Sequence, residues 1–438
     1  MEIVLILHNS DDSKYAKYSN SHVSLFKNND SLFLKNETYE LKYLAYLLSS
    51  ELCKIRTISI YTSFTEDKEY EEFFNNFNSF KSLTTLKLYQ IDEITLKNLC
   101  NVLCNNNQLQ SLEIRDILSN EQTEIIAHML KNNKSLTEIN LQNNNFNAKG
   151  ISVILNAISL NSSLKRVNLM NNNVYGFNSR IKKFNKLLCE ILLKTTTLKY
   201  LNLSNMIHDI TSDFGYGLEM NSTLTELNLS KNSISSKGFI ILFDSLKYNN
   251  KLKTLDVSYN ALDRDLEDNI AEHISDCLKI NTSITNINFD SLDFENIGIK
   301  YIADLLTVNK TLKEINLRSN SFTSDGFEMI SNALINSNNT IERINLSSNG
   351  IGKFGDKYIS ELLIQNNTLK YINLSNTKID SDKFLNIVNG LKYNKSITEV
   401  DFSYNNLILA DLNMFIKVIE DNNLNIKHYN FEKCGVNR

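Results

Sequence analysis

The sequence predicts an α/β solenoid, in which one short strand and one helix form a unit that repeats along the chain. Three observations predict this fold class. An apolar-x-x-apolar-x-apolar pattern starts fourteen times, at spacings of 26 to 34 residues. Alternating apolar residues predict a short strand at each of these starts, as in residues 136–141 (LTEINL). After a turn, residues 149–161 have apolar side chains at helical spacing.

The strand pattern recurs at a nearly constant period. Such a period is typical of a chain in which each unit buries its apolar edge on its neighbours. When a strand–helix unit repeats with the same handedness, the strands run parallel and the helices lie on one side of the sheet. We therefore expect a right-handed horseshoe over residues 55–438, with a parallel sheet on the concave face and helices on the convex face. The units start at Ile55, Leu83, Leu109, Leu136, Leu164, Leu198, Leu224, Leu252, Ile284, Leu312, Ile341, Leu369, Ile397 and Ile426.

The two ends of the chain depart from the period. Residues 1–54 are expected to form an N-terminal cap, since a solenoid end needs shielding. Within it, residues 22–26 and 31–35 are predicted to form a hairpin, and residues 39–52 a helix. The last strand, at Ile426, is followed by only seven residues. We expect no capping helix there, so this edge is a candidate for pairing with a second copy as a homodimer.

Composition and charge exclude several classes of protein. Hydrophobic residues make up 42% of the chain, which is too many for a disordered polymer. The 46 basic and 50 acidic residues are interspersed, and this argues against a nucleic-acid partner, which needs a basic face. The apolar run at residues 3–7 is too short for a signal peptide or a spanning helix, so we expect a cytoplasmic protein without membrane contact.

Candidate chemistry is sparse. Six cysteines are expected to be free thiols of a reducing compartment: Cys53, Cys100, Cys104, Cys189, Cys277 and Cys434. Cys100 and Cys104 share a helix face and could be half a metal site, but no second pair or histidine at ligand spacing accompanies them. We interpret both as core thiols. With scattered histidines and no glycine-rich phosphate loop, the sequence predicts no enzyme, no cofactor and no metal.

Asparagine occupies two columns of the repeat. The first lies eight residues after the strand start and is expected to satisfy backbone groups in the turn: Asn144, Asn172, Asn232, Asn260, Asn320, Asn349 and Asn405. Ile91, Ile117, Met206 and Leu292 replace it, so those turns are expected to be irregular. The second column lies three residues before the strand and is expected to end helices in the left-handed conformation: Asn106, Asn133, Asn161, Asn221, Asn249, Asn281, Asn309, Asn338, Asn366, Asn394 and Asn423.

The concave face carries one patterned row, two residues after each strand start. It contains the set Glu138, Arg166, Tyr200 and Glu226, and six units later the set Glu314, Arg343, Tyr371 and Glu399. Because neighbouring strands lie about 4.8 Å apart, each Arg is expected to pair with the preceding Glu and to stack on the following Tyr. Two interpretations remain open: a self-satisfied surface ladder, or a partner-binding surface with Arg166, Tyr200, Arg343, Tyr371, Glu138 and Glu314 as candidates.

The repeat resembles a known family. Leu136, Ile139, Leu141, Asn144 and Phe146 follow the pattern LxxLxLxxNxL of leucine-rich repeats, and the length near 28 residues resembles the ribonuclease-inhibitor-like subtype. The resemblance covers the chain from Ile55 onward. It implies an intracellular protein–protein interaction scaffold that binds a protein on its concave face.

An alternative comes from a member of the same subtype, the activating protein of the small GTPase Ran. The resemblance implies a catalytic loop arginine in the early repeats, where Arg115 follows the strand at Leu109, and a strongly acidic tail. Here the adjoining turn is Asp-Ile-Leu-Ser and the chain ends in Val-Asn-Arg, so both features depart from that pattern. Roles as an actin-related or ubiquitin-ligase adaptor are implied by fold analogy only.

Overall fold

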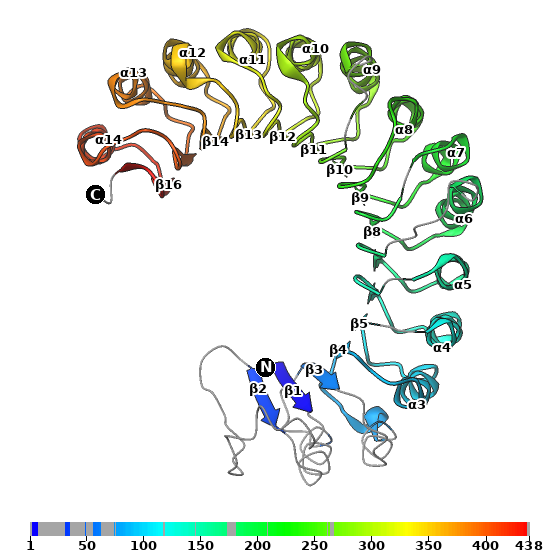
Figure 1. Ribbon diagram of the computed structural model, residues 1–438. Helices are drawn as coiled ribbons and strands as arrows, with labels where there is room; N and C mark the ends of the chain where they lie inside the picture. Colours follow the sequence, from blue (N-terminus) through cyan, green and yellow to red (C-terminus); the bar gives the residue numbers. More distant parts are fainter. Residues whose placement is uncertain are drawn as a thin grey trace. The chain divides into compact units, whose positions relative to one another are not determined.

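The computed structural model describes residues 2–7, 31–35, 49, 56–62, 74, 76–116, 119–144, 146–172, 181–207, 209–260, 262 and 267–435. These residues fall into two compact units, Met1–Met206 and Ile207–Arg438. Each unit is built from the predicted repeat of strand, turn and helix (Figure 1). The α/β solenoid class is therefore confirmed.

The first unit contains a parallel sheet in which β3 to β8 follow one another in chain order. Its elements are β1 (Glu2–Leu7), β2 (Ser31–Lys35), β3 (Thr57–Thr62), the short 3₁₀-helix η1 (Phe77–Ser79), β4 (Thr85–Tyr89), α3 (Glu93–Leu103), β5 (Ser111–Arg115), α4 (Asn120–Asn132), β6 (Glu138–Asn140), α5 (Ala148–Leu160), β7 (Arg166–Asn168), α6 (Ile181–Lys194) and β8 (Tyr200–Asn202).

The N-terminal strands extend this sheet. The apolar run at residues 3–7 belongs to β1, which lies between β3 and β2 and runs parallel to both. β2 coincides with the second strand of the predicted hairpin, but its described partner is β1. The predicted first strand, residues 22–26, lies outside the described residues, as does the predicted helix at 39–52 apart from Ser49.

The second unit contains a parallel sheet of β9 to β16 in chain order. In Figure 1 the strands of this unit follow the inner side of its curve and helices α8 to α14 follow the outer side. The elements are α7 (Ser212–Met220), β9 (Glu226–Asn228), α8 (Ser236–Tyr248), β10 (Thr254–Asp256), α9 (Glu267–Ile280), β11 (Asn286–Asn288), α10 (Glu295–Val308), β12 (Glu314–Asn316), α11 (Ser324–Asn336), β13 (Arg343–Asn345), α12 (Gly352–Gln365), β14 (Tyr371–Asn373), α13 (Ser381–Leu391), β15 (Glu399–Asp401), α14 (Leu409–Asp421) and β16 (His428–Asn430).

The core lies between the sheet and the helices. Leu136, Ile139 and Leu141 of one repeat are fully buried, and so are Ile154 and Leu155 of the helix that follows. In most of the three-residue strands only the middle residue is buried and the flanking residues are partly exposed. Alternation in each strand therefore points one row of side chains into the core and leaves two rows on the solvent face.

The motif asparagines join neighbouring repeats. Asn172 Nδ2 donates to the carbonyl of Leu141 one repeat earlier (2.7 Å) and to that of Leu169 in its own repeat (2.8 Å). Asn172 Oδ1 accepts from the backbone N–H of Asn144 (3.1 Å). The amide thus satisfies turn groups that have no sheet partner. All seven motif asparagines are buried: Asn144, Asn172, Asn232, Asn260, Asn320, Asn349 and Asn405.

The second asparagine column forms another buried ladder, with a backbone that differs from the expectation. Asn249 has φ −68° and ψ 123°, so its backbone is extended. The predicted left-handed conformation is wrong there and at the other helix ends of this type, although Asn423 has φ 48°. Asn249 Oδ1 accepts from the N–H groups of Lys251 (3.0 Å) and Leu252 (2.9 Å), and Nδ2 donates to the carbonyl of Leu218 (2.7 Å), one repeat earlier.

The left-handed residue lies instead just before the motif asparagine, as at Asn143 (φ 60°). It also occurs where the motif asparagine is replaced: Gln90, Asn205 and Ser291 have φ 57°, 50° and 56° and precede Ile91, Met206 and Leu292. The three turns therefore keep the left-handed residue of the regular turns, and the prediction that they are irregular is wrong in this respect. Ile117 lies outside the described residues. The Leu292 turn has two further left-handed residues, Asp293 and Glu295.

Candidate functional site

The candidate site is the solvent face of the sheet, and its main feature is the row two residues after each repeat start, here called the position-two row. In the first unit, strand register aligns Ser111, Glu138, Arg166 and Tyr200. In the second unit it aligns Asn286, Glu314, Arg343, Tyr371 and Glu399, with Glu226 three strands before Glu314. The eight residues of the two sets, which include the six candidates, are all partly exposed.

Arg343 and Tyr371 form a stacked pair. The guanidinium carbon of Arg343 lies 4.2 Å from the ring centroid of Tyr371, within the range of a cation–π contact. Arg343 Nη2 also lies 3.3 Å from Glu399 Oε2, on the strand beyond the tyrosine. The side chains of Arg343 and Glu399 are 40% and 34% exposed, so the pair is accessible from solvent. Burial raises the pKa of Tyr371, so the phenol stays neutral at physiological pH.

The ion pair differs from the expected one. Arg343 was expected to pair with Glu314 on the preceding strand, but Glu314 Oε2 accepts a hydrogen bond from Asn286 Nδ2 at 2.7 Å. An arginine that lies across the ring of Tyr371 directs its terminal nitrogens toward β15 rather than back to β12. Stacking on Tyr371 therefore determines that Arg343 pairs with Glu399 and not with Glu314.

The first unit contains the same stack. The guanidinium carbon of Arg166 lies 4.0 Å from the ring centroid of Tyr200. Glu138 Oε2 lies 3.4 Å from Ser111 Oγ, a long hydrogen bond on the side away from Arg166. Each unit therefore presents an arginine stacked over a tyrosine of the next strand.

A second polar cluster, around Arg115, was only partly predicted. Arg115 Nε lies 2.5 Å from Glu113 Oε1, and the hydroxyl of Tyr89 donates to the same oxygen at 3.1 Å. The guanidinium carbon of Arg115 lies 5.5 Å from the ring centroid of Tyr89. The sequence singled out Arg115 as a residue after the strand, whereas it is the last residue of β5. Tyr89 and Glu113 could have been found as polar positions on neighbouring strands.

A column of exposed lysines lies one residue after the repeat start and was missed by the sequence reasoning. Lys370 Nζ lies 2.6 Å from Glu342 Oε2, and this hydrogen bond lowers the pKa of Glu342. Because Glu residues of the position-two row lie beside these lysines, the surface carries both signs of charge. The lysines are Lys165 and Lys199 in the first unit and Lys253, Lys313, Lys370 and Lys427 in the second.

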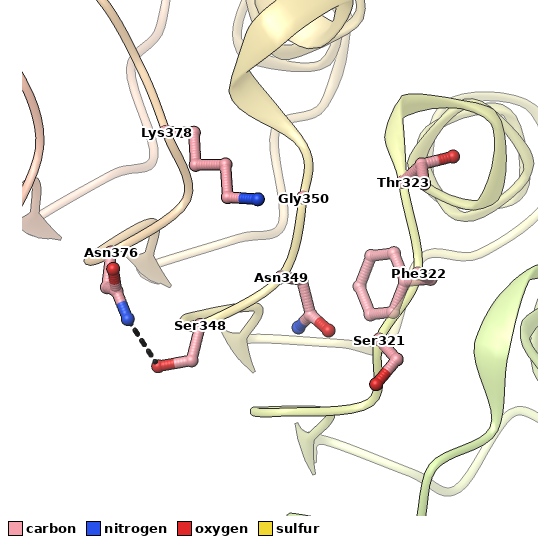
Figure 2. A pocket seen from close by; sticks show the side chains of 8 residues that line it. All are labelled: Ser321, Phe322, Thr323, Ser348, Asn349, Gly350, Asn376 and Lys378. Atoms are coloured by element: carbon pink, nitrogen blue, oxygen red, sulfur yellow. Dashed lines mark hydrogen bonds between the residues drawn. The ribbon is translucent and has the colours of Figure 1, made fainter.

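A shallow cavity of about 280 Å³ lies among the loops that leave β12, β13 and β14 (Figure 2). Asn376 Nδ2 donates to Ser348 Oγ at 3.2 Å on its rim, and Lys378 extends toward Gly350. Pockets for drug-sized ligands or cofactors have about 300–1,000 Å³. This cavity lies just below that range. Its other lining residues are Ser321, Phe322, Thr323 and Asn349.

The cysteines lie in two environments. Cys100, Cys189, Cys277 and Cys434 are buried free thiols, and Cys53 lies outside the described residues. Burial raises the pKa of the Cys100 thiol. Cys104 is partly exposed rather than in the core, and its Sγ lies 3.7 Å from His128 Nδ1 on α4. That histidine belongs to the next repeat, so spacing along the chain did not suggest it.

Comparison with known proteins agrees with this repeat geometry. A family model described as Leucine Rich repeat matches residues 132–155, 221–240, 248–264, 308–331 and 337–355. Each segment contains a repeat start or the turn after it. The chain contains leucine-rich repeats. The ribonuclease-inhibitor-like subtype stays a prediction for this leucine-rich-repeat protein, and a comparison with curated protein sequences gave no match.

Solved structures similar to this leucine-rich-repeat protein include a chain from the Rad7 and Elc1 complex in yeast, at 14% identity and a TM-score of 0.45, covering 85% of each chain. A chain from the TLR13–ssRNA13 complex has 16% identity and a TM-score of 0.45, covering 91% of this chain and 61% of that one. A third is leiomodin-1 actin-binding site 2, at 26% identity and a TM-score of 0.26, covering 32% of this chain and 79% of that one. In the described part of the chain, no helix has the length and apolarity needed to cross a bilayer.

Proposed function

We propose that this leucine-rich-repeat protein is an interaction scaffold that binds a protein partner on the solvent face of its sheet. The observation that carries the proposal is the arginine stacked on a tyrosine in each unit, Arg166 on Tyr200 and Arg343 on Tyr371. Arg and Tyr are among the residues that contribute most to interface energies. Held by parallel strands, both side chains lose little conformational freedom when a partner binds.

The size of the face supports a protein partner. Seven strand spacings of about 4.8 Å separate β9 from β16, which makes a row about 34 Å long. A standard interface of about 800 Å² per partner is about 32 Å across if it is round. The row of the second unit is therefore long enough to bury such an interface.

The charges indicate what the partner surface contains. Exposed lysines lie beside Glu314 and Glu399, so a polyanion would meet repulsive carboxylates as well as cations on this face. A protein surface with both acidic and basic groups fits better. The five described free thiols fit a reducing compartment such as the cytosol, where we place the scaffold. We do not propose the GTPase-activating alternative, because Arg115 is engaged by Glu113 and Tyr89.

The test is a measurement of affinity with matched variants. The full chain is used to capture partners from its native cell, and the affinity of each recovered protein is then measured by titration. We expect Arg343→Ala/Tyr371→Ala to weaken binding by at least about 30-fold, the effect of losing one hot spot of about 2 kcal/mol.

The control variant is Tyr248→Ala/Lys251→Ala, which removes one exposed aromatic and one exposed cation on and beside α8. It should bind like the wild-type chain. Circular dichroism should show that both double variants are folded. Equal affinity of the wild-type chain and Arg343→Ala/Tyr371→Ala would reject the proposed surface, as would equal losses in the two double variants.

A further inference from the structure

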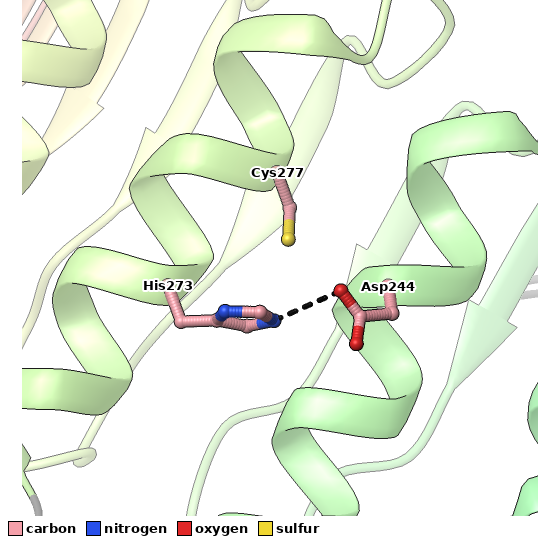
Figure 3. Close-up of side chains that lie close together, drawn as sticks. All are labelled: Asp244, His273 and Cys277. Carbon is pink, nitrogen blue, oxygen red and sulfur yellow. Dashed lines mark ion pairs between the residues drawn. The ribbon is translucent and has the colours of Figure 1, made fainter.

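Three side chains with metal-ligand chemistry meet on the helical side of the second unit. Asp244 lies on α8, and His273 and Cys277 lie on α9 (Figure 3). Their possible ligand atoms all lie within 4.8 Å of one another, and His273 Nε2 is 3.1 Å from Asp244 Oδ1. This cluster is separate from the sheet face on which the proposed protein-binding surface lies.

The sequence and the packing of the helices bring these atoms together. His273 and Cys277 are four residues apart, so they project from the same face of α9. The third side chain comes from the preceding repeat, because α8 and α9 pack side by side. Cys100 and Cys104 were the predicted half site, although the His-x-x-x-Cys spacing is visible in the sequence at residues 273–277.

The distances suit a transition-metal ion. Zinc binds His nitrogen, Asp oxygen and Cys sulfur at about 2.0–2.3 Å, so ligand atoms around a tetrahedral ion lie about 3.3–3.8 Å apart. The 3.1 Å between His273 and Asp244 is within about 0.2 Å of that range. Small rotations of the Cys277 and Asp244 side chains would bring the remaining atoms to the same separation.

The state of the histidine is a second observation that indicates a ligand. His273 Nε2 is shut off from solvent and makes no hydrogen bond, since its approach to Asp244 is close but lacks hydrogen-bond geometry. A buried ring nitrogen that makes no hydrogen bond is costly. Coordination of an ion by this nitrogen would satisfy it. The ring as a whole is 28% exposed, which leaves a path for an ion to enter.

We propose that Asp244, His273 and Cys277 bind a divalent transition-metal ion of the zinc type, with a fourth position open to water or to another ligand. Three protein ligands with an open position are the arrangement of non-structural zinc sites. Mixed nitrogen, sulfur and oxygen donors exclude Mg²⁺ and Ca²⁺, which prefer oxygen ligands. Because the ligands come from two successive helices, a bound ion joins neighbouring repeats.

Two features oppose binding and set its strength. Lys247 Nζ lies 2.8 Å from Asp244 Oδ1, so this ammonium must turn toward solvent when a cation enters. Burial raises the pKa of the Cys277 thiol to about 11, and Lys247 acts in the opposite direction. The metal must therefore displace the thiol proton.

The test uses Co²⁺ as a spectroscopic probe for the zinc-type site. The full chain is titrated with Co²⁺ under reducing conditions, and the thiolate-to-cobalt charge-transfer band is recorded. We expect one equivalent to bind with a sulfur band that Zn²⁺ abolishes. Cys277→Ser should remove the band, and His273→Ala and Asp244→Asn should weaken binding. Lys247→Met should tighten binding by about 10-fold, because it removes an ammonium that competes with the metal for Asp244.

Cys104→Ser is the matched control, because Cys104 lies near a histidine of the next helix and could produce a similar band. It should leave the spectrum unchanged. The proposal fails if the wild-type chain gives no sulfur band, if Cys277→Ser retains it, or if Cys104→Ser removes it. His273→Ala and Asp244→Asn, at partly exposed positions, keep the test decisive should Cys277→Ser not fold.

Discussion

The side-chain oxygen of Asn349 accepts a hydrogen bond from the backbone N–H of Asn320, 2.9 Å away and one repeat earlier. The amide nitrogen of Asn349 donates to the carbonyls of Leu317 and Leu346, both at 2.9 Å. One buried side chain therefore connects two turns that are 29 residues apart. Asparagine in this column stabilises the interface between repeats as well as its own turn.

Replacing Asn349 by alanine is expected to destabilise the second unit by about 2–4 kcal/mol, because it leaves several buried backbone groups unsatisfied. Asn349→Thr should cost less, since Thr377 occupies the same column and donates to the carbonyl of Leu374 at 2.7 Å. Urea unfolding followed by circular dichroism measures both. Asn332→Ala, at an exposed position of helix α11, is the control. Equal stabilities of Asn349→Ala and Asn332→Ala would contradict this role.

Asn249→Asp is expected to give a destabilisation that grows with pH. The substitution turns a donor that faces the carbonyls of Leu218 and Asn221 into a buried carboxylate, whose pKa should rise above the unfolded value of about 3.9. The folded state then binds more protons than the unfolded state above about pH 4, so stability falls as pH rises. Asn249→Ala lacks this carboxyl and serves as the control. If the difference in stability between the two variants does not change from pH 5 to pH 8, the side chain at position 249 is not a buried donor to these carbonyls.

Alanine should destabilise the protein far more at Gly352 than at Gly350. A Cβ at Gly352 would lie 2.3 Å from the carbonyl carbon of Lys378 and 2.4 Å from the nitrogen of Ile379, and these backbone atoms cannot turn away. A Cβ at Gly350 would meet its nearest atom at 3.5 Å, an ordinary contact. We expect Gly352→Ala to cost about 3 kcal/mol, at the upper end for overpacking, and Gly350→Ala to cost less than about 0.5 kcal/mol. Thermal unfolding of both variants measures the two losses of stability, and equal losses would contradict the prediction.

The Lys370–Glu342 pair should make a small, pH-dependent contribution. The pKa of Glu342 is lowered by the hydrogen bond from Lys370, so its stabilisation is present above the unfolded pKa of about 4.3 and is lost as pH falls through the folded pKa. Both side chains are well exposed, so Lys370→Met should cost only about 0.5 kcal/mol at pH 7 and nothing at pH 3. Lys253→Met is the control, since Lys253 forms no ion pair within the described ranges. A loss that persists at pH 3 would rule out the ion pair.

The fold could be predicted because its cause is local. Alternating apolar residues in segments such as 136–141 place one row of side chains in the core, and the helical spacing at residues 149–161 does the same for the helix. Both patterns depend only on neighbours within a few positions. The row that contains Arg343 and Tyr371 followed from the same alternation, and strand register keeps it aligned.

The partners of polar side chains could not be predicted in the same way. Asn249 was expected to turn the chain by its own backbone, but its amide reaches a carbonyl one repeat earlier and its backbone is extended. Arg343 was expected to pair with the nearest carboxylate, but its stacking on Tyr371 directs it to Glu399. In both cases the choice depends on the direction of a side chain in three dimensions.

By itself, the sequence determined the repeat, the parallel sheet, the helices on one side of it and the residues that share each row, because burial of apolar side chains sets the period. Only the tertiary structure decided which polar atoms of successive repeats meet, as Asp244 does with His273 and Cys104 with His128. The physical reason is that hydrogen bonds and metal coordination depend on distances of tenths of an ångström and on direction, whereas hydrophobic burial depends mainly on area.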